Sequence, residues 1–362
     1  MSPGAQKKAW LVLQDGTAFE GVRFGAESDA VGELVFTTNM CGYLETLTDP
    51  SYWGQIVLQT FPLIGNYGVI EEDFEGACCV KGYVVRHWCP TPSNFRSGGD
   101  LDAFLKAKGV PGICGIDTRE VTRIIREKGV TNAVITSQPP ADLAFLADYR
   151  VENAVKSVSC TASAVFPALG EERFHVALMD YGAKANIVRE LQKRGCRVTV
   201  LPADTTAEQV LALGPDGVLL SNGPGDPAEN TGCIAQLAKL LGRVPIFGIC
   251  LGHQLLALAA GGETVKLKYG HRGANQPARD LVTGRTYITS QNHGYAVVAP
   301  SVPGASPRFV NANDGTCEGL DYPGKGAFTV QFHPEACAGP RDTGFLFDRF
   351  MQLMEGGSDD AT

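Results

Sequence analysis

The sequence contains no uninterrupted apolar run of the roughly 18 residues that a membrane-spanning helix needs. Residues 1–8 form a short polar segment, and no apolar segment as long as a signal-peptide core follows them, so no signal peptide is expected. No run of Lys and Arg exceeds two residues, and the formal net charge is −8. These features predict a protein that binds neither a membrane nor a nucleic acid.

Two kinds of binding motif are also missing from the sequence. It has no Cys-x-x-Cys pair, which argues against a structural zinc site, and no Gly-x-x-x-x-Gly-Lys phosphate loop. We therefore expect no metal and no nucleotide cofactor in this chain. The eleven cysteines are scattered along the sequence. Reduced and mostly buried thiols in a cytoplasmic protein are the expected state.

The length and composition suit two domains of the α/β class. The chain has 362 residues, of which 44% are hydrophobic and 43 are glycine, and a domain typically has about 150 residues. We predict a strand-rich α+β domain over residues 1–150, a connecting segment over 151–173, and an α/β domain over 174–355. A disordered tail is expected over 356–362.

The second domain shows an alternation of short apolar runs and helical patterns. Apolar strands are predicted at 174–179, 197–201, 217–221 and 245–249, with a helical segment in each interval. This order predicts a mostly parallel sheet that is covered by helices. Ligands of such sheets bind beyond the carboxyl ends of the strands. Functional residues are therefore expected directly after the strands.

A cysteine follows the last of these strands, in the sequence Gly248-Ile-Cys-Leu-Gly252, and a helical run comes next. This Gly-x-nucleophile-x-Gly pattern is typical of a sharp turn from strand to helix that exposes a nucleophile. The helix N-terminus favours a thiolate, and the N–H of Leu251 can stabilise an oxyanion. Taken alone, the pentapeptide is equally compatible with a buried turn cysteine. The flanking strand and helix favour Cys250 as a nucleophile.

A thiol nucleophile needs a base and a group that orients the base. Among the six histidines, His333 follows a predicted strand at 327–332 and precedes Pro334 and Glu335. A carboxylate two residues away, held by a rigid proline, can orient the imidazole. Cys250, His333 and Glu335 are therefore the predicted nucleophile, base and orienting residue. The other histidines are expected to have packing or surface roles.

A second glycine cluster lies directly after the strand at 217–221, in the sequence Asn222-Gly-Pro-Gly-Asp-Pro227. Gly223 and Gly225 would let backbone N–H groups approach a ligand or an oxyanion closely. A phosphate loop is the competing interpretation, but its Gly-x-x-x-x-Gly-Lys pattern is absent, and a Gly-Pro-Gly sequence alone would indicate only a turn.

Three of these segments together resemble the class I glutamine amidotransferases: Asn222–Pro227, Gly248–Gln254 and Gln331–Glu335. The first domain also resembles that of the carbamoyl-phosphate synthetase small-chain family, through Thr38–Tyr52, Phe61–Gly68 and Gly112–Arg119. The resemblance covers essentially the whole chain. It implies a class I amidotransferase domain that follows a strand-rich docking domain.

The resemblance also implies roles for individual residues. Cys250 would attack the glutamine amide to form a γ-glutamyl thioester, with His333 as the base and Glu335 as its orienting residue. The N–H groups of Leu251 and Gly225 would form the oxyanion hole. The glutamine-binding set would comprise Ser51, Gly223, Gly225, Leu251, Gln254, Asn292, Gly294 and Tyr295. Phe is usual at the position of Tyr295, and an added hydroxyl is compatible with binding by backbone groups.

The family further implies a division of labour between two chains. The small chain hydrolyses glutamine to glutamate and ammonia, and the ammonia passes to a large chain. That partner would bind ATP and divalent metal, and would make carbamoyl phosphate from bicarbonate for arginine and pyrimidine synthesis. The two chains would form a heterodimer, alone or within a higher oligomer.

Two alternative functions stay open on the sequence alone. One is a cysteine hydrolase that acts on another γ-glutamyl substrate, which a substrate panel would distinguish. The other is a non-catalytic scaffold that docks to a synthetase, against which the intact Cys250, His333 and Glu335 argue.

Overall fold

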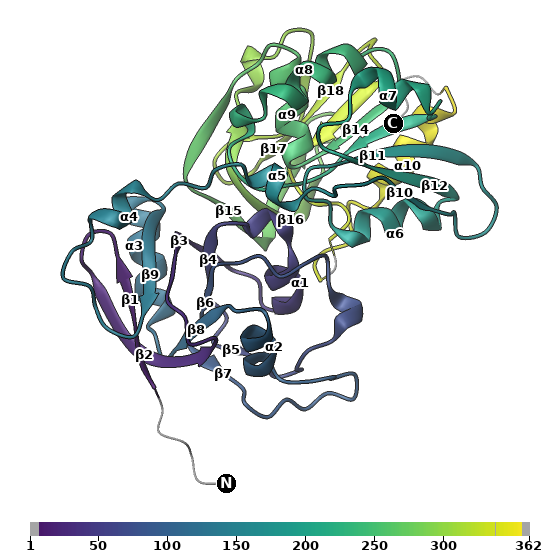
Figure 1. The fold of residues 1–362 in the computed structure, drawn as a ribbon. Coiled ribbons are helices and arrows are strands. Elements are labelled where there is room, and N and C mark those ends of the chain that lie inside the picture. Colours follow the sequence, from purple (N-terminus) through teal and green to yellow (C-terminus); the bar gives the residue numbers. More distant parts are fainter. Residues whose placement is uncertain (1–6, 337, 357–362) are drawn as a thin grey trace. The chain divides into compact units, whose positions relative to one another are not determined.

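A computed structural model describes residues 7–336 and 338–356 of the chain. The chain divides into two compact units, with the boundary between Glu152 and Asn153 (Figure 1). Within the described residues, the helices are too short or too polar to cross a membrane.

The first unit is built around a closed barrel of strands in the order β1-β2-β8-β6-β4-β3-β9. Neighbours along β3-β4-β6-β8 are parallel, and the other pairs are antiparallel. The strands are β1 (Lys8–Leu13), β2 (Ala18–Gly25), β3 (Ala30–Thr37), β4 (Gln55–Gln59), β6 (Gly82–Val84), β8 (Pro111–Cys114) and β9 (Thr131–Thr136), with a separate pair β5 (Leu63–Ile64) and β7 (His87–Trp88). The helices are α1 (Tyr43–Thr48), α2 (Leu101–Ala107), α3 (Thr118–Lys128) and α4 (Ala144–Asp148), with short 3-10 turns at Pro50–Tyr52 and Glu71–Asp73.

Helix α3 shows how local sequence sets an element in this unit. Val121, Ile124 and Ile125 recur at helical spacing, and all three are buried. The Asp117 side chain accepts a hydrogen bond from the N–H of Glu120 and so caps the first turn. Gly129 ends the helix with φ 101°, a conformation that favours glycine. The spacing of the apolar residues, the cap and the glycine thus account for the position and both ends of the helix.

The second unit contains a ten-stranded sheet in the order β10-β12-β11-β13-β14-β19-β18-β17-β15-β16. Its strands are β10 (Ala164–Phe166), β11 (Phe174–Asp180), β12 (Cys196–Pro202), β13 (Gly217–Leu220), β14 (Ile246–Ile249), β15 (Thr264–Asp280), β16 (Thr286–Val297), β17 (Ser306–Asn311), β18 (Cys317–Tyr322) and β19 (Ala327–Val330). The helices are α5 (Ala154–Val158), α6 (Ala185–Lys193), α7 (Ala207–Ala212), α8 (Thr231–Leu240), α9 (Leu251–Ala259) and α10 (Phe345–Met354), with 3-10 turns at Pro227–Glu229 and Ala299–Ser301.

Helices cover both faces of this sheet (Figure 1). Apolar residues of α7, α8 and α9 share one buried cluster with Ala177 and Met179 of β11. Residues of α6 and α10 share another cluster with Val176 and Leu178 of the same strand. Because successive strand residues point to opposite faces, the middle of β11, residues 176–179, has to be apolar on both sides, and the strand is buried along its whole length. The α/β class predicted from the near-continuous apolar strands is confirmed.

The parallel strands β12, β11, β13, β14 and β19 form one part of the sheet. Their carboxyl ends lie at one edge because parallel strands run in the same direction. The glycine cluster follows β13, Cys250 follows β14 and His333 follows β19 within three residues. The topology therefore brings three distant sequence motifs to the same edge.

The rest of the sheet differs from the prediction of a mostly parallel arrangement. Strands β15 to β18 and the edge strand β10 pair antiparallel. The segment 151–173, predicted as a connection between domains, carries α5 and β10 in the second unit. Strand β10 has only three residues, all of them exposed, so its sequence has no alternation that would indicate a strand.

The cysteines also differ from the prediction of mostly buried thiols. Of the ten that the structure describes, Cys196, Cys250 and Cys317 are buried, and the others are exposed or half-buried. All ten are free thiols. The eleventh, Cys337, and residues 357–362 of the predicted disordered tail lie outside the described residues.

Candidate active site

Cys250 occupies a strained position between β14 and α9. Its backbone has φ 53° and ψ −102°, a combination that residues other than glycine rarely adopt. Its N–H donates to the carbonyl of Val330 at 2.8 Å, which ties the turn to β19. Helix α9 begins at Leu251, the residue that follows Cys250. The thiol therefore stands directly at the helix N-terminus, as a nucleophile elbow requires.

The glycines on either side of Cys250 are required by packing. A Cβ atom at Gly252 would lie 2.4 Å from the carbonyl oxygen of Leu220, and one at Gly248 would lie 2.8 Å from the Cγ2 atom of Thr329. Real Cβ atoms do not approach other atoms so closely. The pattern recognised in the sequence thus reflects the close approach of α9 to the strands beside it.

His333 and Glu335 are fully buried and form a close pair. The Nδ1 atom of His333 lies 2.7 Å from the Oε1 atom of Glu335. Since a carboxylate accepts, Nδ1 carries the proton and Nε2 is the nitrogen left to act as a base. The N–H of His333 donates to the carbonyl of Ser290, which fixes the backbone after β19. The structure places the predicted base and orienting residue in the predicted contact.

Lys184 is a third charged group at this pair, and the sequence reasoning missed it. Its Nζ atom lies 3.3 Å from Nδ1 of His333 and 3.5 Å from Oε1 of Glu335. Lys184 follows β11 at the same edge of the sheet as Cys250 and His333. The rule that ligands gather beyond the carboxyl ends of parallel strands was the signal that could have found it.

The charges of this cluster shift two pKa values in opposite directions. Burial and the Lys184 ammonium favour neutral imidazole, but Glu335 and the Cys250 thiol outweigh them and raise the pKa of His333 to about 9. Burial would raise the pKa of Glu335, but His333 and Lys184 outweigh it and lower that pKa to about 2. Thiols ordinarily have a pKa of about 8.5, so a base of this strength can accept a thiol proton.

Strand β16 passes beside the nucleophile. The Cys250 thiol donates to the carbonyl of Asn292 at 3.7 Å. The Gln254 side chain donates to the carbonyl of Tyr295 at 2.8 Å and to the side-chain oxygen of Gln331 at 2.9 Å. Four predicted residues, Gln254, Asn292, Gly294 and Tyr295, thus lie on α9 or β16 around one elbow.

The glycine cluster after β13 packs against the same elbow. A Cβ atom at Gly223 would lie 2.8 Å from the Cδ2 atom of Leu251 and 2.2 Å from the carbonyl oxygen of Tyr181. Gly225 has φ 87°, and a Cβ atom there would lie 2.8 Å from Cβ of Ala154. Only glycine fits either position, so the backbone of this loop comes close to the residue that follows Cys250.

Ser51 belongs to the first unit, in the 3-10 turn Pro50–Tyr52. Its side chain is buried, and its N–H donates to the Asp49 carboxylate at 2.9 Å. The Asp49 side chain thus caps this turn. The role of Ser51 in glutamine binding stays a prediction.

Two other features of the second unit are separate from this site. His253 is buried, and its Nδ1 atom forms a hydrogen bond with the Thr329 hydroxyl at 2.7 Å, a packing role like the one predicted for it.

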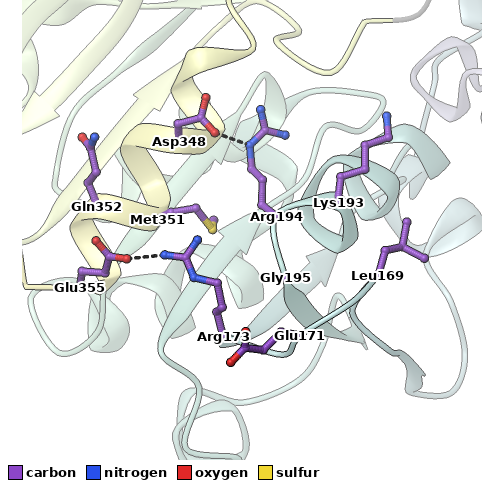
Figure 2. Close-up of a pocket in the computed structure, with 10 residues that line it drawn as sticks. All are labelled: Leu169, Glu171, Arg173, Lys193, Arg194, Gly195, Asp348, Met351, Gln352 and Glu355. Carbon is purple, nitrogen blue, oxygen red and sulfur yellow. Dashed lines mark hydrogen bonds and ion pairs between the residues drawn. The ribbon is translucent and has the colours of Figure 1, made fainter.

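A pocket of about 460 Å³ lies between α6 and α10 (Figure 2). Two of the cations that line it, Arg173 and Arg194, are paired with Glu355 and Asp348. None of the predicted site residues lines this pocket.

The backbone of Cys250 gives a stability prediction. Glycine adopts a positive φ without strain, and such strain costs about 1–3 kcal/mol. Glycine also loses about 0.5–1 kcal/mol more backbone entropy than alanine on folding. We expect Cys250→Gly to be more stable than Cys250→Ala by about 1 kcal/mol, measured as the difference between their urea unfolding curves. Equal stabilities, or a more stable alanine variant, would show that the strain is no larger than the entropy that glycine loses, about 0.5–1 kcal/mol.

Two family models match the chain. Residues 177–353 match the class-I glutamine amidotransferase model, and residues 11–135 match the CPSase domain of the carbamoyl-phosphate synthase small chain. The first match covers the elbow, the glycine cluster and the His333–Glu335 pair. The second covers the strands of the closed barrel.

Similarity to curated proteins extends over the whole length. The carbamoyl phosphate synthase small chain of Listeria monocytogenes serotype 4b is 49% identical over 96% of this chain and 97% of its own. That of Fusobacterium nucleatum is 50% identical over 95% of this chain and 98% of its own. The pyrimidine-specific small chain of Bacillus subtilis is 48% identical over 96% of both chains. With both units matched and the nucleophile elbow in place, the chain belongs to the carbamoyl-phosphate synthase small chain family.

Proposed function

We propose that this chain is the glutamine-hydrolysing subunit of a carbamoyl-phosphate synthetase and that Cys250, His333 and Glu335 form its catalytic triad. The observation that carries this proposal is the strained cysteine at the head of α9, in the same buried cluster as a His333–Glu335 pair. The family to which the chain belongs supports the same function.

In the proposed reaction, the sulfur of Cys250 attacks the side-chain amide carbon of glutamine while His333 takes the thiol proton. The resulting tetrahedral intermediate expels ammonia, which leaves with a proton from His333, and a γ-glutamyl thioester forms. Water then attacks the thioester, which releases glutamate and restores the thiol. Glu335 holds the imidazole in the orientation that these proton transfers need.

The oxyanion of each intermediate would be stabilised by the N–H groups of Leu251 and Gly225. Gly223, Gln254, Asn292, Gly294 and Tyr295, together with Ser51, would bind the glutamine. The proximity of Gly223 to Leu251 and of Asn292 to Cys250 supports this set.

The ammonia would be delivered to a large chain in a heterodimer, alone or within a higher oligomer. That partner would bind ATP and divalent metal and would use bicarbonate to make carbamoyl phosphate. The product would serve arginine and pyrimidine synthesis in the cytoplasm. The pyrimidine-specific name of the Bacillus subtilis relative is consistent with one of these routes.

A substrate panel with and without the large chain tests this proposal. We expect slow glutamate release from glutamine by this chain alone, and an increase of at least about tenfold when the large chain, ATP and bicarbonate are added. Free γ-glutamyl peptides should stay uncleaved in both conditions. Cleavage of γ-glutamyl peptides with glutamine inert would indicate a different hydrolase. An absence of any hydrolysis, even with the large chain, would indicate a scaffold.

A further inference from the structure

Three buried side chains that the proposed reaction does not use meet in the antiparallel part of the sheet. They are His271 on β15, His293 on β16 and Glu318 on β18, and one potential ligand atom from each lies within 4.8 Å of the others. The three residues are 8%, 5% and 0% exposed. Burying two imidazoles and a carboxylate together is costly unless each is bonded, so this cluster needs an explanation.

The outer hydrogen bonds of the two histidines define which ring nitrogens carry protons. His271 directs Nε2 at the Asp314 carboxylate at 2.8 Å, and His293 directs Nδ1 at the carbonyl of Tyr295 at 2.7 Å. Both partners can only accept, so both of these nitrogens carry hydrogen. The opposite nitrogens, Nδ1 of His271 and Nε2 of His293, then carry the lone pairs, and the Asn311 side-chain nitrogen lies 3.4 Å from Nδ1 of His271. Metal-binding histidines are oriented in this way by carboxylates and carbonyls.

Glu318 supplies the third ligand. Its Oε1 atom lies 3.5 Å from Nδ1 of His271 and accepts a hydrogen bond from Asn311 at 2.9 Å. Its Oε2 atom is buried and makes no hydrogen bond to any residue that the structure describes. Two ligands of a tetrahedral zinc ion lie about 3.4 Å apart when each is about 2.1 Å from the metal. The separation of 3.5 Å between Oε1 and Nδ1 suits a shared ion, whereas any pair near the 4.8 Å limit of the cluster would have to come closer when an ion binds.

A proton on His271 is the competing explanation. Burial lowers the pKa of His271, but Glu318 and Asp314 outweigh it and raise that pKa, so a charged imidazole could bridge the two carboxylates. A proton on His271 would not explain the contact that His293 makes with Gln291. The Nε2 lone pair of His293 lies 3.1 Å from the side-chain oxygen of Gln291, and that amide is oriented by its own hydrogen bond to Thr289. Two acceptors face each other there, which a cation between the strands would resolve.

We propose that His271, His293 and Glu318 form a structural zinc site in the second unit, with the Gln291 side-chain oxygen or water as a fourth ligand. Two imidazoles and one carboxylate are a zinc ligand set, whereas magnesium and calcium prefer oxygen ligands alone. The sequence reasoning expected no metal, because these ligands lie on three strands and form no short motif. None of the three ligands takes part in the proposed glutaminase reaction.

The site would join β18 to two strands with which it does not pair, whereas β15 and β16 already pair with His271 opposite His293. Strand β17 lies between β18 and β15, and β15 lies between β17 and β16. An ion held by His271, His293 and Glu318 would connect all three ligand-bearing strands at one point. Because β16 also carries Asn292, zinc would stabilise the strand that passes beside Cys250.

Zinc content and thermal unfolding of the full chain test the proposal. The measurements use a Cys250→Ser background, since a catalytic thiol can bind zinc itself. After equilibration with Zn²⁺ and removal of the excess, we expect one more zinc per chain in this background than in the same chain with Glu318→Gln. Zinc should raise the unfolding temperature of the background by several degrees and leave that of Glu318→Gln unchanged. Its zinc affinity should fall at least tenfold.

Two further variants make the result decisive. Asp314→Asn keeps the three ligands but weakens the outer hydrogen bond of His271, so zinc affinity should fall about 10- to 100-fold with folding intact. His175→Gln changes another buried histidine of this unit, which bonds Thr199, and should leave zinc binding unchanged. Equal zinc content and equal thermal shifts in the background and Glu318→Gln would overturn the proposal. If Glu318→Gln does not fold, an unchanged zinc affinity in Asp314→Asn would overturn it.

Discussion

Replacing Cys250 by serine is expected to reduce glutamine-driven carbamoyl phosphate synthesis by about a thousandfold or more, in a complex reconstituted with the large chain. A serine hydroxyl is nearly isosteric with the thiol but loses its proton far less readily, so His333 would no longer generate a useful nucleophile. Synthesis from free ammonia should stay within about twofold of the wild type, because that reaction bypasses the amide cleavage. Both rates are measured as carbamoyl phosphate formed with glutamine or with ammonium chloride.

Cys317→Ser is the matched control for this experiment. Cys317 is also buried in the second unit, and its sulfur also donates to a backbone carbonyl, that of Gly319, at 3.7 Å. We expect this variant to keep glutamine-driven synthesis within about twofold. Retention of glutamine-driven synthesis by Cys250→Ser would refute its assignment as the nucleophile. Equal loss of the ammonia-driven rate would show that the substitution damages the complex rather than the amide cleavage.

The second large effect is expected from Gly252→Ala. The added Cβ atom would meet the carbonyl oxygen of Leu220 at 2.4 Å and the Cβ atom of Leu220 at 2.6 Å. Both obstacles lie at the end of a central strand, so α9 has to move away from β13. We expect a loss of about 1–3 kcal/mol in the free energy of unfolding. We also expect at least about a hundredfold loss of glutaminase activity, since small displacements of reacting groups are costly.

Gly232→Ala provides the opposite expectation within the same unit. Gly232 lies in α8, and an added Cβ atom there would meet nothing within 4 Å. Alanine stabilises a helix by up to about 1 kcal/mol relative to glycine, so this variant should be as stable as the wild type or more stable, with full activity. Urea unfolding and glutamate release measure both variants. If Gly252→Ala behaves like Gly232→Ala, the packing explanation of the elbow is wrong.

Much of the catalytic arrangement was predictable because its signals are local. A turn that requires glycine at positions 248 and 252, or a carboxylate two residues after a histidine, is encoded in adjacent residues. The parallel half of the sheet was predictable for a related reason, since strands buried on both faces are apolar throughout. The roles of individual residues in glutamine binding came from the family resemblance rather than from such signals.

The features that were not predicted depend on contacts between distant segments. Lys184 has no motif around it, and it reaches His333 only because β11 and β19 end at the same edge. The cluster of His271, His293 and Glu318 spans three strands in the same way. Strands β15 and β16 carry mixed polar and apolar residues with bulges between their paired stretches, so neither shows a clear twofold alternation. Periodicity cannot detect strands of this kind.

The closed barrel of the first unit limits how another protein can bind to it. In an open sheet, the outermost strand offers a row of unpaired backbone groups, on which a segment of a partner can be added as an extra strand. Each strand from β1 to β9 that forms the barrel already has a neighbour on both sides. Recognition of the barrel by a partner therefore has to rely on side chains and loops. Specificity at such a surface would follow residue identity, and exchange of strands between copies of the barrel would require it to open first.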